Sequence, residues 1–127
     1  MRQTFTMAVP TDVVITSNRT AQVWRRGKTK DAMRALTRAA AAGLYPCGRA
    51  SIYVGITKRT GTLYDPVNLS DTFKGCVDEL VSMGVIDEDN YRFVTGPFLY
   101  HQGVDKRLSA KTLRALVTLT DYSTTPF

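Results

Sequence analysis

Two segments in the first half of the chain alternate apolar and polar residues, with the period of two that a half-buried strand requires. Residues 4–9 (TFTMAV) predict a first strand, which ends at Pro10 because proline has no N–H to donate to a strand ladder. Residues 50–57 (ASIYVGIT) predict a second main strand, and one of its faces carries Ile52, Val54 and Ile56. Between the two, DVVITS is short enough to form either a further strand or an extended loop.

Two later segments predict the remaining strands. Residues 91–100 (YRFVTGPFLY) read as a third strand, with Gly96 and Pro97 marking a bulge or a bend. The last strand lies around Arg114–Thr120. Because alternate residues of a strand share a face, this strand predicts one face formed by Ala115, Val117 and Leu119.

Helical sequence appears first in the run AMRALTRAAAA, whose residues have high helix propensity. It predicts a helix from about Thr29 to Ala42, and Gly43 ends it. The apolar stripe of this helix would consist of Ala32, Ala35, Leu36 and Ala39, with Arg34 and Arg38 on its basic side. We expect so narrow a stripe to approach the sheet or a partner closely.

A second helix reads best from about Ser70 to Met83, with Ser70 as its N-cap and Gly84 as its end. Pro66 fits only in the turn before it. One face of this helix is apolar and consists of Leu69, Phe73, Cys76, Val77, Leu80 and Met83. The other face is charged and carries Asp71, Lys74 and Asp78.

The order of these elements predicts an α+β fold, in which a mixed, mostly antiparallel β-sheet is covered by two main helices. With 127 residues, of which 43% are hydrophobic, we expect a single domain spanning residues 1–127. No apolar run reaches the roughly 20 residues that span a bilayer, and no signal peptide is present, so we expect a soluble cytoplasmic protein without a membrane partner. Cys47 and Cys76 give no zinc pattern, and Cys76 is expected in the core. The one histidine, His101, is expected at the surface.

The net charge of +6 is unevenly distributed along the chain. Residues 1–61 carry a net charge of +9, and residues 62–127 carry a net charge of −3. A basic first half beside an acidic second half predicts an anion-binding surface next to a cation site, which is what a metal-dependent nuclease needs. The alternative is that the basic surface binds nothing, as in many small basic proteins.

The most nucleic-acid-like stretch is SNRTAQVWRRGKTK, in which basic residues surround the single tryptophan. The candidate phosphate contacts are Arg19, Arg25, Arg26, Lys28 and Lys30, together with the later basic turn of Lys58 and Arg59. Trp24 could stack on an unpaired base. The competing role is that of a core anchor with the basic residues as its solvated flank, and we favour that role.

Acidic residues flank the second helix at both ends. Asp65 lies just before it, near the end of a strand, and Asp87, Glu88 and Asp89 follow it. A helix of about 14 residues is roughly 20 Å long, so the two acidic turns can share a site only through strand pairing or across a symmetric dimer. If they meet, such an oxygen-rich cluster favours Mg²⁺ or Mn²⁺. If they do not, both are ordinary solvated turns.

Three motifs, DPVNL, TFKGCVDEL and MGVIDED, follow one another around this helix. Their order and spacing resemble the core signature of the RusA-like family of phage and prophage Holliday-junction resolvases, in the form found in phages of actinobacteria. The resemblance implies a RusA-like fold and cleavage of branched DNA by a homodimer that depends on Mg²⁺ or Mn²⁺. It also implies that the protein works in the cytoplasm of a host cell.

The resemblance assigns roles to individual residues. The first acid, the asparagine, the helix lysine and the helix aspartate of the family match Asp65, Asn68, Lys74 and Asp78, and its paired acids match Glu88 and Asp89. The implied catalytic residues are Asp65, Lys74 and Asp89, and the implied metal ligands are Asp65, Glu88 and Asp89. Ser17, Asn18 and Arg19 resemble the loop that leads into the first long helix of the family, which adds Asn18 to the candidate DNA contacts.

One position departs from the family pattern. The second acid of the first turn is replaced by Val67, which cannot bind a metal or accept a proton. Asp71 and Asp87 are the open candidates for a compensating ligand. The alternative function is therefore a catalytically impaired protein on the same scaffold, which binds DNA or a host protein without cutting. A small-molecule enzyme has little support, because no cofactor fingerprint is present.

Overall fold

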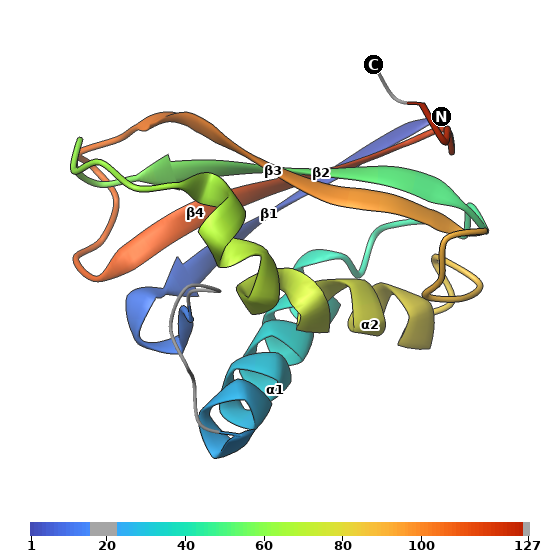
Figure 1. Ribbon diagram of the computed structural model, residues 1–127, viewed down its shortest axis with the longest axis horizontal. Coiled ribbons are helices and arrows are strands. Elements are labelled where there is room, and N and C mark those ends of the chain that lie inside the picture. The colour runs from blue at the N-terminus through green and yellow to red at the C-terminus, as the bar shows by residue number, and fades with distance from the viewer. Residues whose placement is uncertain (16–22, 126–127) are drawn as a thin grey trace.

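The computed structural model describes residues 1–15 and 23–125, and for Val23 and Trp24 the backbone alone. Within these residues the centre of the molecule is a four-stranded sheet in the order β1-β4-β2-β3 (Figure 1). The strands are β1 (Arg2–Pro10), β2 (Ala50–Lys58), β3 (Val94–Val104) and β4 (Thr112–Thr120). β4 pairs antiparallel with both β1 and β2, whereas β3 runs parallel to β2. The predicted mixed, mostly antiparallel sheet is confirmed.

The alternation of side chains decides which face of the sheet is buried. On β1 every second residue is buried, and these residues are Gln3, Phe5, Met7 and Val9. The faces predicted for the other two strands are also buried, at Ile52, Val54 and Ile56 on β2 and at Ala115, Val117 and Leu119 on β4. The periodicity of β1, β2 and β4 therefore predicted correctly that these strands exist and which of their faces is buried.

β3 begins and ends a few residues later than the predicted third strand. The peptide bond between Gly96 and Pro97 is cis, and the register between β2 and β3 shifts between Ser51 and Tyr53. Gly96 has a φ of 100°, and a Cβ atom there would lie 2.6 Å from the backbone oxygen of Ile52. The predicted bulge is confirmed, and its backbone is accessible to glycine alone.

The segment DVVITS after β1 was left open between strand and loop by the sequence. Its last two residues lie outside the described residues, and its first two belong to a short 3-10 helix, η1 (Thr11–Val13). Just beyond it, the hydroxyl of the buried Thr72 donates to the carbonyl oxygen of Ile15 (2.7 Å) and accepts from its N–H (3.1 Å). This part of the chain therefore satisfies its backbone through a side chain rather than through a neighbouring strand.

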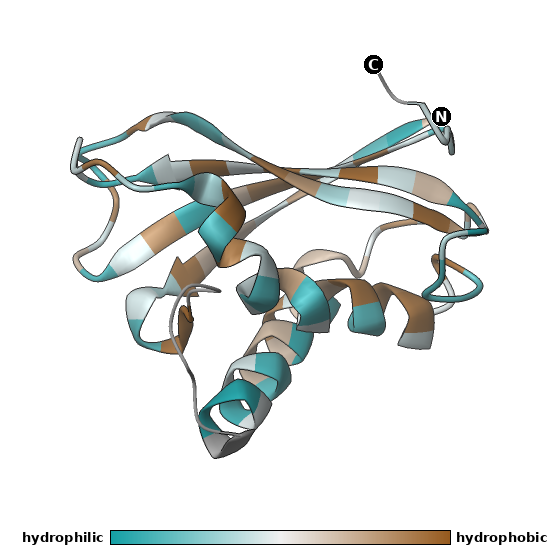
Figure 2. Ribbon diagram, in the orientation of Figure 1, coloured by the Kyte–Doolittle hydropathy of each residue, from teal (hydrophilic) through white to brown (hydrophobic). Residues whose placement is uncertain are grey.

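Helix α1 (Val23–Ala40) begins several residues before the predicted start at Thr29. The predicted apolar stripe is wrong in part, because Ala35 and Ala39 are exposed. Among the described side chains of α1, those of Thr29, Met33 and Thr37 are buried. Figure 2 shows that much of this helix is coloured as hydrophilic. Met33 buries far more apolar surface than an alanine can, and Thr37 satisfies its hydroxyl by donating to the carbonyl oxygen of Met33 at 2.7 Å.

The predicted second helix consists of two elements, the 3-10 helix η2 (Pro66–Phe73) and the α-helix α2 (Lys74–Ser82). Ser70 is not an N-cap, since its hydroxyl donates back to the carbonyl oxygen of Val67 at 2.6 Å. The capping residue is Asp65, whose carboxylate accepts from the N–H of Val67 at 3.1 Å. The helical segment therefore starts one turn earlier than the sequence indicated.

The predicted apolar face of this segment is confirmed, with buried side chains at Leu69, Phe73, Cys76, Val77 and Leu80. The predicted end is confirmed as well, because Gly84 adopts a φ of 79° in the turn that follows α2. α1 and α2 lie on the same side of the sheet, and the core lies between them and its buried face (Figure 1). In the described part of the chain, no helix is both long and apolar enough to cross a membrane.

Candidate active site

Basic residues of α1 face acidic residues of η2 and α2. The basic residues recur at every fourth position, which places on one side of the helix Arg26, Lys30, Arg34 and Arg38. The guanidinium of Arg26 lies 2.9 Å from the carboxylate of Asp71, and the ammonium of Lys30 lies 3.0 Å from that of Asp78. The two helical segments are therefore held in register by charge as well as by apolar packing.

The buried residue Glu79 completes this row. Only 4% of it is exposed, and its two carboxylate oxygens bind Arg34 (2.9 Å) and Arg38. The helices approach closely next to it, because a Cβ atom on Gly75 would lie 2.6 Å from the backbone oxygen of Lys30. This contact fixes where the side chain of Lys30 leaves α1, and so brings it within reach of the acids on α2.

A groove of about 370 Å³ opens between α1, α2 and the start of β3. Its lining residues are Lys30, Ser70, Lys74, Val77, Asp78, Asp89 and Pro97. Within it the carboxyl groups of Asp78 and Asp89 lie close enough to each other for each to shift the pKa of the other. Two ionised carboxylates repel each other at such a separation, so a proton or a cation between them would stabilise the pair.

The two acids of this pair have opposite pKa shifts. Burial and the neighbouring Asp78 both raise the pKa of Asp89 above its ordinary value. Burial acts in the same direction on Asp78, but the hydrogen bonds from Lys30 and Asp89 outweigh it and lower the pKa of Asp78. Of the two acids, Asp89 therefore takes up a proton more readily, and Asp78 is the ion-pair partner of Lys30.

Lys74 stands at the edge of the groove on the first turn of α2. Its ammonium lies 3.3 Å from the carboxylate of Asp71, and 73% of its side chain is exposed. The hydrogen bond from Arg26, helped by Lys74, holds the pKa of Asp71 below its usual range. Asp71 is thus an ionised residue that positions Arg26 and Lys74 beside the groove. Its carboxylate oxygens face these two cations and do not point into the groove as ligands.

The structure does not bring Asp65 and Asp89 together within one chain. β2 and β3 run parallel, so Asp65, beyond the last residue of β2, and Asp89, before the first residue of β3, lie at opposite ends of the sheet (Figure 1). Of the two routes that could join the acidic turns, strand pairing is therefore excluded, and only a second copy of the chain is left. Among the residues that the structure describes, no group of three or more Asp, Glu, His or Cys side chains is arranged to hold a metal ion.

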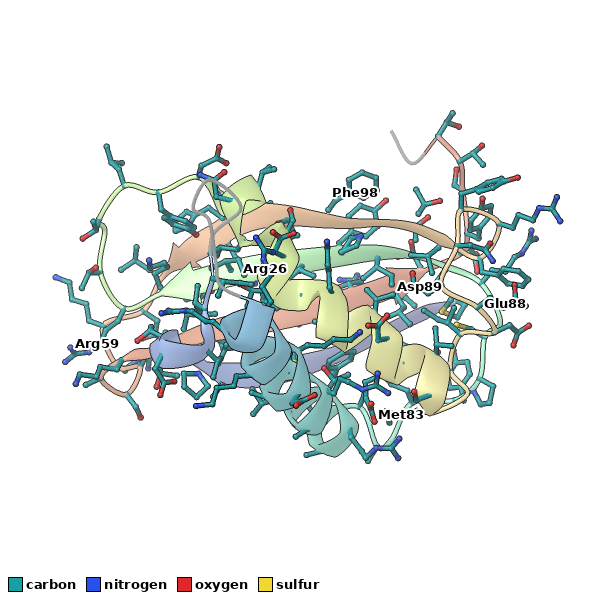
Figure 3. The ribbon with its side chains drawn as sticks, turned by 60° about the horizontal axis from the view of Figure 1, so that its bottom comes forward. Arg26, Arg59, Met83, Glu88, Asp89 and Phe98 are labelled. Atoms are coloured by element: carbon teal, nitrogen blue, oxygen red, sulfur yellow. The ribbon has the colours of Figure 1, made fainter. Side chains whose placement is uncertain are left out.

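The other predicted ligand, Glu88, lies next to Asp89 at the same end of the molecule (Figure 3). Its carboxylate is exposed and accepts a hydrogen bond from the side-chain amide of Asn90 at 2.9 Å. It is not among the residues that line the groove. Asp87 is turned elsewhere, with a carboxylate oxygen beside Gly48.

The predicted DNA-binding residues that the structure describes lie in three places. Asn18 and Arg19 fall outside the described residues. The exposed residues Arg25 and Lys28 line a second groove of about 580 Å³ at the start of α1. Lys58 and Arg59 lie at the end of β2, where the ammonium of Lys58 is 4.6 Å from the ring centre of Tyr64, and Figure 3 shows Arg59 at the end opposite Asp89. The two remaining candidates, Arg26 and Lys30, bind the acids of η2 and α2.

Sequence reasoning recognised the charged residues of the groove but not their grouping. Lys30 was assigned to DNA, and Asp78 was matched to the family pattern without a catalytic role, yet the two form one ion pair. The period of four in the basic residues of α1, matched by acids on one face of the next helix, was the signal that could have joined them. Nothing in the sequence around Ser70 or Pro97 indicated that these two residues line the groove.

The groove has the chemistry of a small cation site next to a phosphate site. Mg²⁺ commonly binds through one or two carboxylates while its other ligands are water and substrate phosphate, so Asp78 and Asp89 are the residues of this groove that could hold such an ion. Lys30 and Lys74 supply positive charge at the rim of the same groove. In comparisons with known proteins, the sequence matches no family model and no curated protein. Function therefore has to be inferred from the residues of the chain itself.

Proposed function

We propose that this protein is a metal-dependent endonuclease that cleaves branched DNA such as Holliday junctions, with Mg²⁺ or Mn²⁺ as its cofactor. The observation that supports the proposal most is the adjacent pair of carboxyl groups, Asp78 and Asp89, in a groove that also contains two lysines. Carboxylates that hold a hard cation and lysines that hold a phosphate are the two parts that phosphodiester cleavage needs.

In this proposal Asp78 and Asp89 hold the cation, which when bound would supply a nucleophilic hydroxide and neutralise charge on the scissile phosphate. Lys74, held at the groove by Asp71, binds the non-bridging oxygens of that phosphate and stabilises their growing charge. Lys30 keeps Asp78 ionised and oriented.

This assignment changes the expectation drawn from the family resemblance in three respects. It keeps Lys74 and Asp89, but it adds Asp78, leaves Asp65 outside the site of its own chain, and leaves Glu88 outside the groove. Membership of the RusA-like family remains a proposal, supported by the order of the three motifs around α2. The homodimer that the resemblance implies would place two such grooves on one branched substrate, and in it Asp65 could reach a groove only from the partner copy.

The test is cleavage of a labelled four-way junction, beside a linear duplex, with Mg²⁺ and then with EDTA. We expect Mg²⁺-dependent nicks in the junction. Asp89→Asn should lower the single-turnover rate at least about a hundredfold without weakening binding, because it removes a ligand and not a phosphate contact. Asp87→Asn, two positions away and turned toward Gly48, is the charge-matched control. Equal losses in the two variants would contradict the assignment of the groove.

A second candidate function is supported by the small number of carboxylates in the groove. The pair offers two carboxylates, and no group of three or more candidate ligands occurs among the residues described. A protein on this scaffold that binds branched DNA or a host protein without cutting is consistent with that finding. Tight binding to the junction, without cleavage in either Mg²⁺ or Mn²⁺, would decide for this alternative.

A further inference from the structure

A shallow concavity of about 460 Å³ lies where β2, β3 and β4 meet the turn that joins β3 to β4. Its lining residues include Thr57, Asp105, Lys106, Arg107 and Arg114. Thr57 and Arg114 each alternate with core residues of their strands, so their side chains leave the sheet on the face away from the helices. The concavity is therefore separate from the groove of Asp78 and Asp89.

Asp105 organises the cations of this concavity. Its Oδ1 atom accepts from the backbone N–H of Arg107 (2.9 Å) and from its Nε (3.2 Å), while Oδ2 accepts from the guanidinium of Arg114 (3.4 Å). A guanidinium has five N–H donors, and Asp105 takes one from each arginine. One carboxylate thus holds two cations side by side while most of their donors remain for a ligand.

The surrounding surface adds to the positive charge. Lys106 lies in the same concavity, and the carbonyl oxygen of Lys58 accepts from the N–H of Asp105 at 2.8 Å, which joins the end of β2 to this turn. Arg59 follows on the same edge (Figure 3). The residues of this basic edge are Lys58, Arg59, Lys106, Arg107 and Arg114, with Asp105 as the counter-charge. Such an excess of cations over one carboxylate is complementary to a polyanion.

We propose that this basic edge is a second nucleic-acid-binding surface, which binds the backbone phosphates of a further arm of the branched substrate. The inference rests on the proposed function and deepens it. The groove faces the helices, whereas the concavity opens on the other face of the sheet at the far end of β2. A short straight duplex that occupies one site leaves the other empty, whereas the diverging arms of a junction can occupy both. Contacts of this kind position the substrate without reading its sequence.

The test compares the binding of a four-way junction and of a short linear duplex in EDTA, so that no cleavage occurs, over a series of salt concentrations. The double variant Lys106→Ala/Arg107→Ala should bind the junction roughly tenfold more weakly, with a salt slope lower by about 2. Its affinity for the linear duplex should fall by about twofold or less. The charge-matched control is Arg2→Ala/Arg92→Ala, which removes two exposed cations near the opposite end of the sheet.

Three outcomes would overturn the inference. The double variant and its control could bind the junction equally well, or the variant could lose junction and duplex binding to the same extent, which would indicate one duplex bound across the whole edge. The unsubstituted protein could also fail to bind either DNA. The proposed function fails separately, on the cleavage rate of saturated junction. That rate should be lost in Asp89→Asn and unchanged in the control Arg2→Ala/Arg92→Ala.

Discussion

Asp78 and Asp89 lie within hydrogen-bonding distance although both are acids, and this has a consequence for stability. The pKa of Asp89 is raised by folding, so the stability that Asp89 contributes is present below its unfolded pKa and is lost as the pH rises through the raised folded pKa. The lowered pKa of Asp78 has the opposite sign, and its contribution is lost as the pH falls through the folded value. At neutral pH without a cation, Asp89 is therefore the member of the pair that opposes folding.

We predict that Asp89→Asn becomes more stable relative to the unsubstituted protein as the pH rises. The amide keeps a hydrogen-bond donor for Asp78 but cannot ionise, so the difference in melting temperature should grow by about 2 °C between about pH 3 and pH 7. Thermal unfolding in EDTA, followed by circular dichroism, measures it. Asp87→Asn serves as the control for the loss of one charge, and parallel curves for Asp89→Asn and the unsubstituted protein would contradict the prediction.

Val67 is the residue that departs from the family pattern, and its place in the fold gives a second prediction. It is 62% exposed in η2, next to the capping residue Asp65 and not among the residues lining the groove. Val67→Asp should therefore leave the initial rate of junction cleavage within about twofold, because the new carboxylate does not reach Asp89 in the same chain. An increase of tenfold or more would show instead that the turn of Asp65 completes a site, which a partner copy would have to provide.

At the scale of the elements, the close approach of α1 and α2 brings the site together. It depends on the absence of a side chain at Gly75, above which the backbone of Lys30 lies. The charged row from Arg26 to Glu79 then follows from the two helical periods, because neither helix can slide without separating several ion pairs at once. The ion pair of Lys30 and Asp78 is one member of this row, so the geometry of the groove is tied to helix packing.

Substitution of two glycines tests this dependence. Gly75→Ala should destabilise the protein by about 2 kcal/mol, since the added Cβ meets backbone atoms that cannot move aside without separating the helices. Gly27→Ala in α1 is the matched control, because no atom of the described residues lies within 4 Å of its added Cβ, and it should stabilise the protein by about 0.5 kcal/mol. Urea unfolding of both variants measures the two changes. A neutral Gly75→Ala would mean that the helices do not need this contact.

The strands could be predicted from the sequence, and the helices only in outline. Alternation on β1, β2 and β4 leaves one face that can be buried, so residues such as Val54 and Val117 were placed correctly. On α1, alanines lie on every side, so the sequence did not show which side of the helix is buried. The buried side is the one that carries Met33, which the pattern did not single out. The cap at Asp65 was missed because Ser70 offered an equally good local signal.

The site shows the same limit. The acids and lysines were recognised as types, but which acids meet depends on whether β3 joins the sheet parallel or antiparallel to β2, and no local pattern states that. An antiparallel β3 would have brought the turns of Asp65 and Asp89 to one edge. The parallel arrangement separates them and leaves Asp89 to pair with Asp78 instead.

For the molecule as a whole, the two cysteines can report on unfolding. Cys76 is 2% exposed, and its burial raises the pKa of the thiol to about 11, so the folded protein presents almost no thiolate there. Cys47 is half-buried, and its thiol donates to the carbonyl oxygen of Val85. We predict that an alkylating reagent at pH 8 modifies Cys47 first, and that Cys76 reacts only at the rate of global unfolding. Mass spectrometry of timed samples, with Cys47→Ser as control, measures both rates. Equal rates at the two cysteines would show that the core beneath α2 opens locally.

The strand order determines when the sheet can form during synthesis of the chain. β4 is the last of the four described strands to be synthesised, yet it lies between β1 and β2, and both of them pair with it. Until residues 112–120 leave the ribosome, β1 lacks the strand that it pairs with in this sheet, and of the four strands only β2 and β3 can pair. Folding therefore waits for the end of this segment and then brings together residues more than a hundred positions apart, such as Arg2 and Thr120. A nascent chain stalled before Thr112 should be digested by protease as an open chain, whereas one that has released β4 should resist.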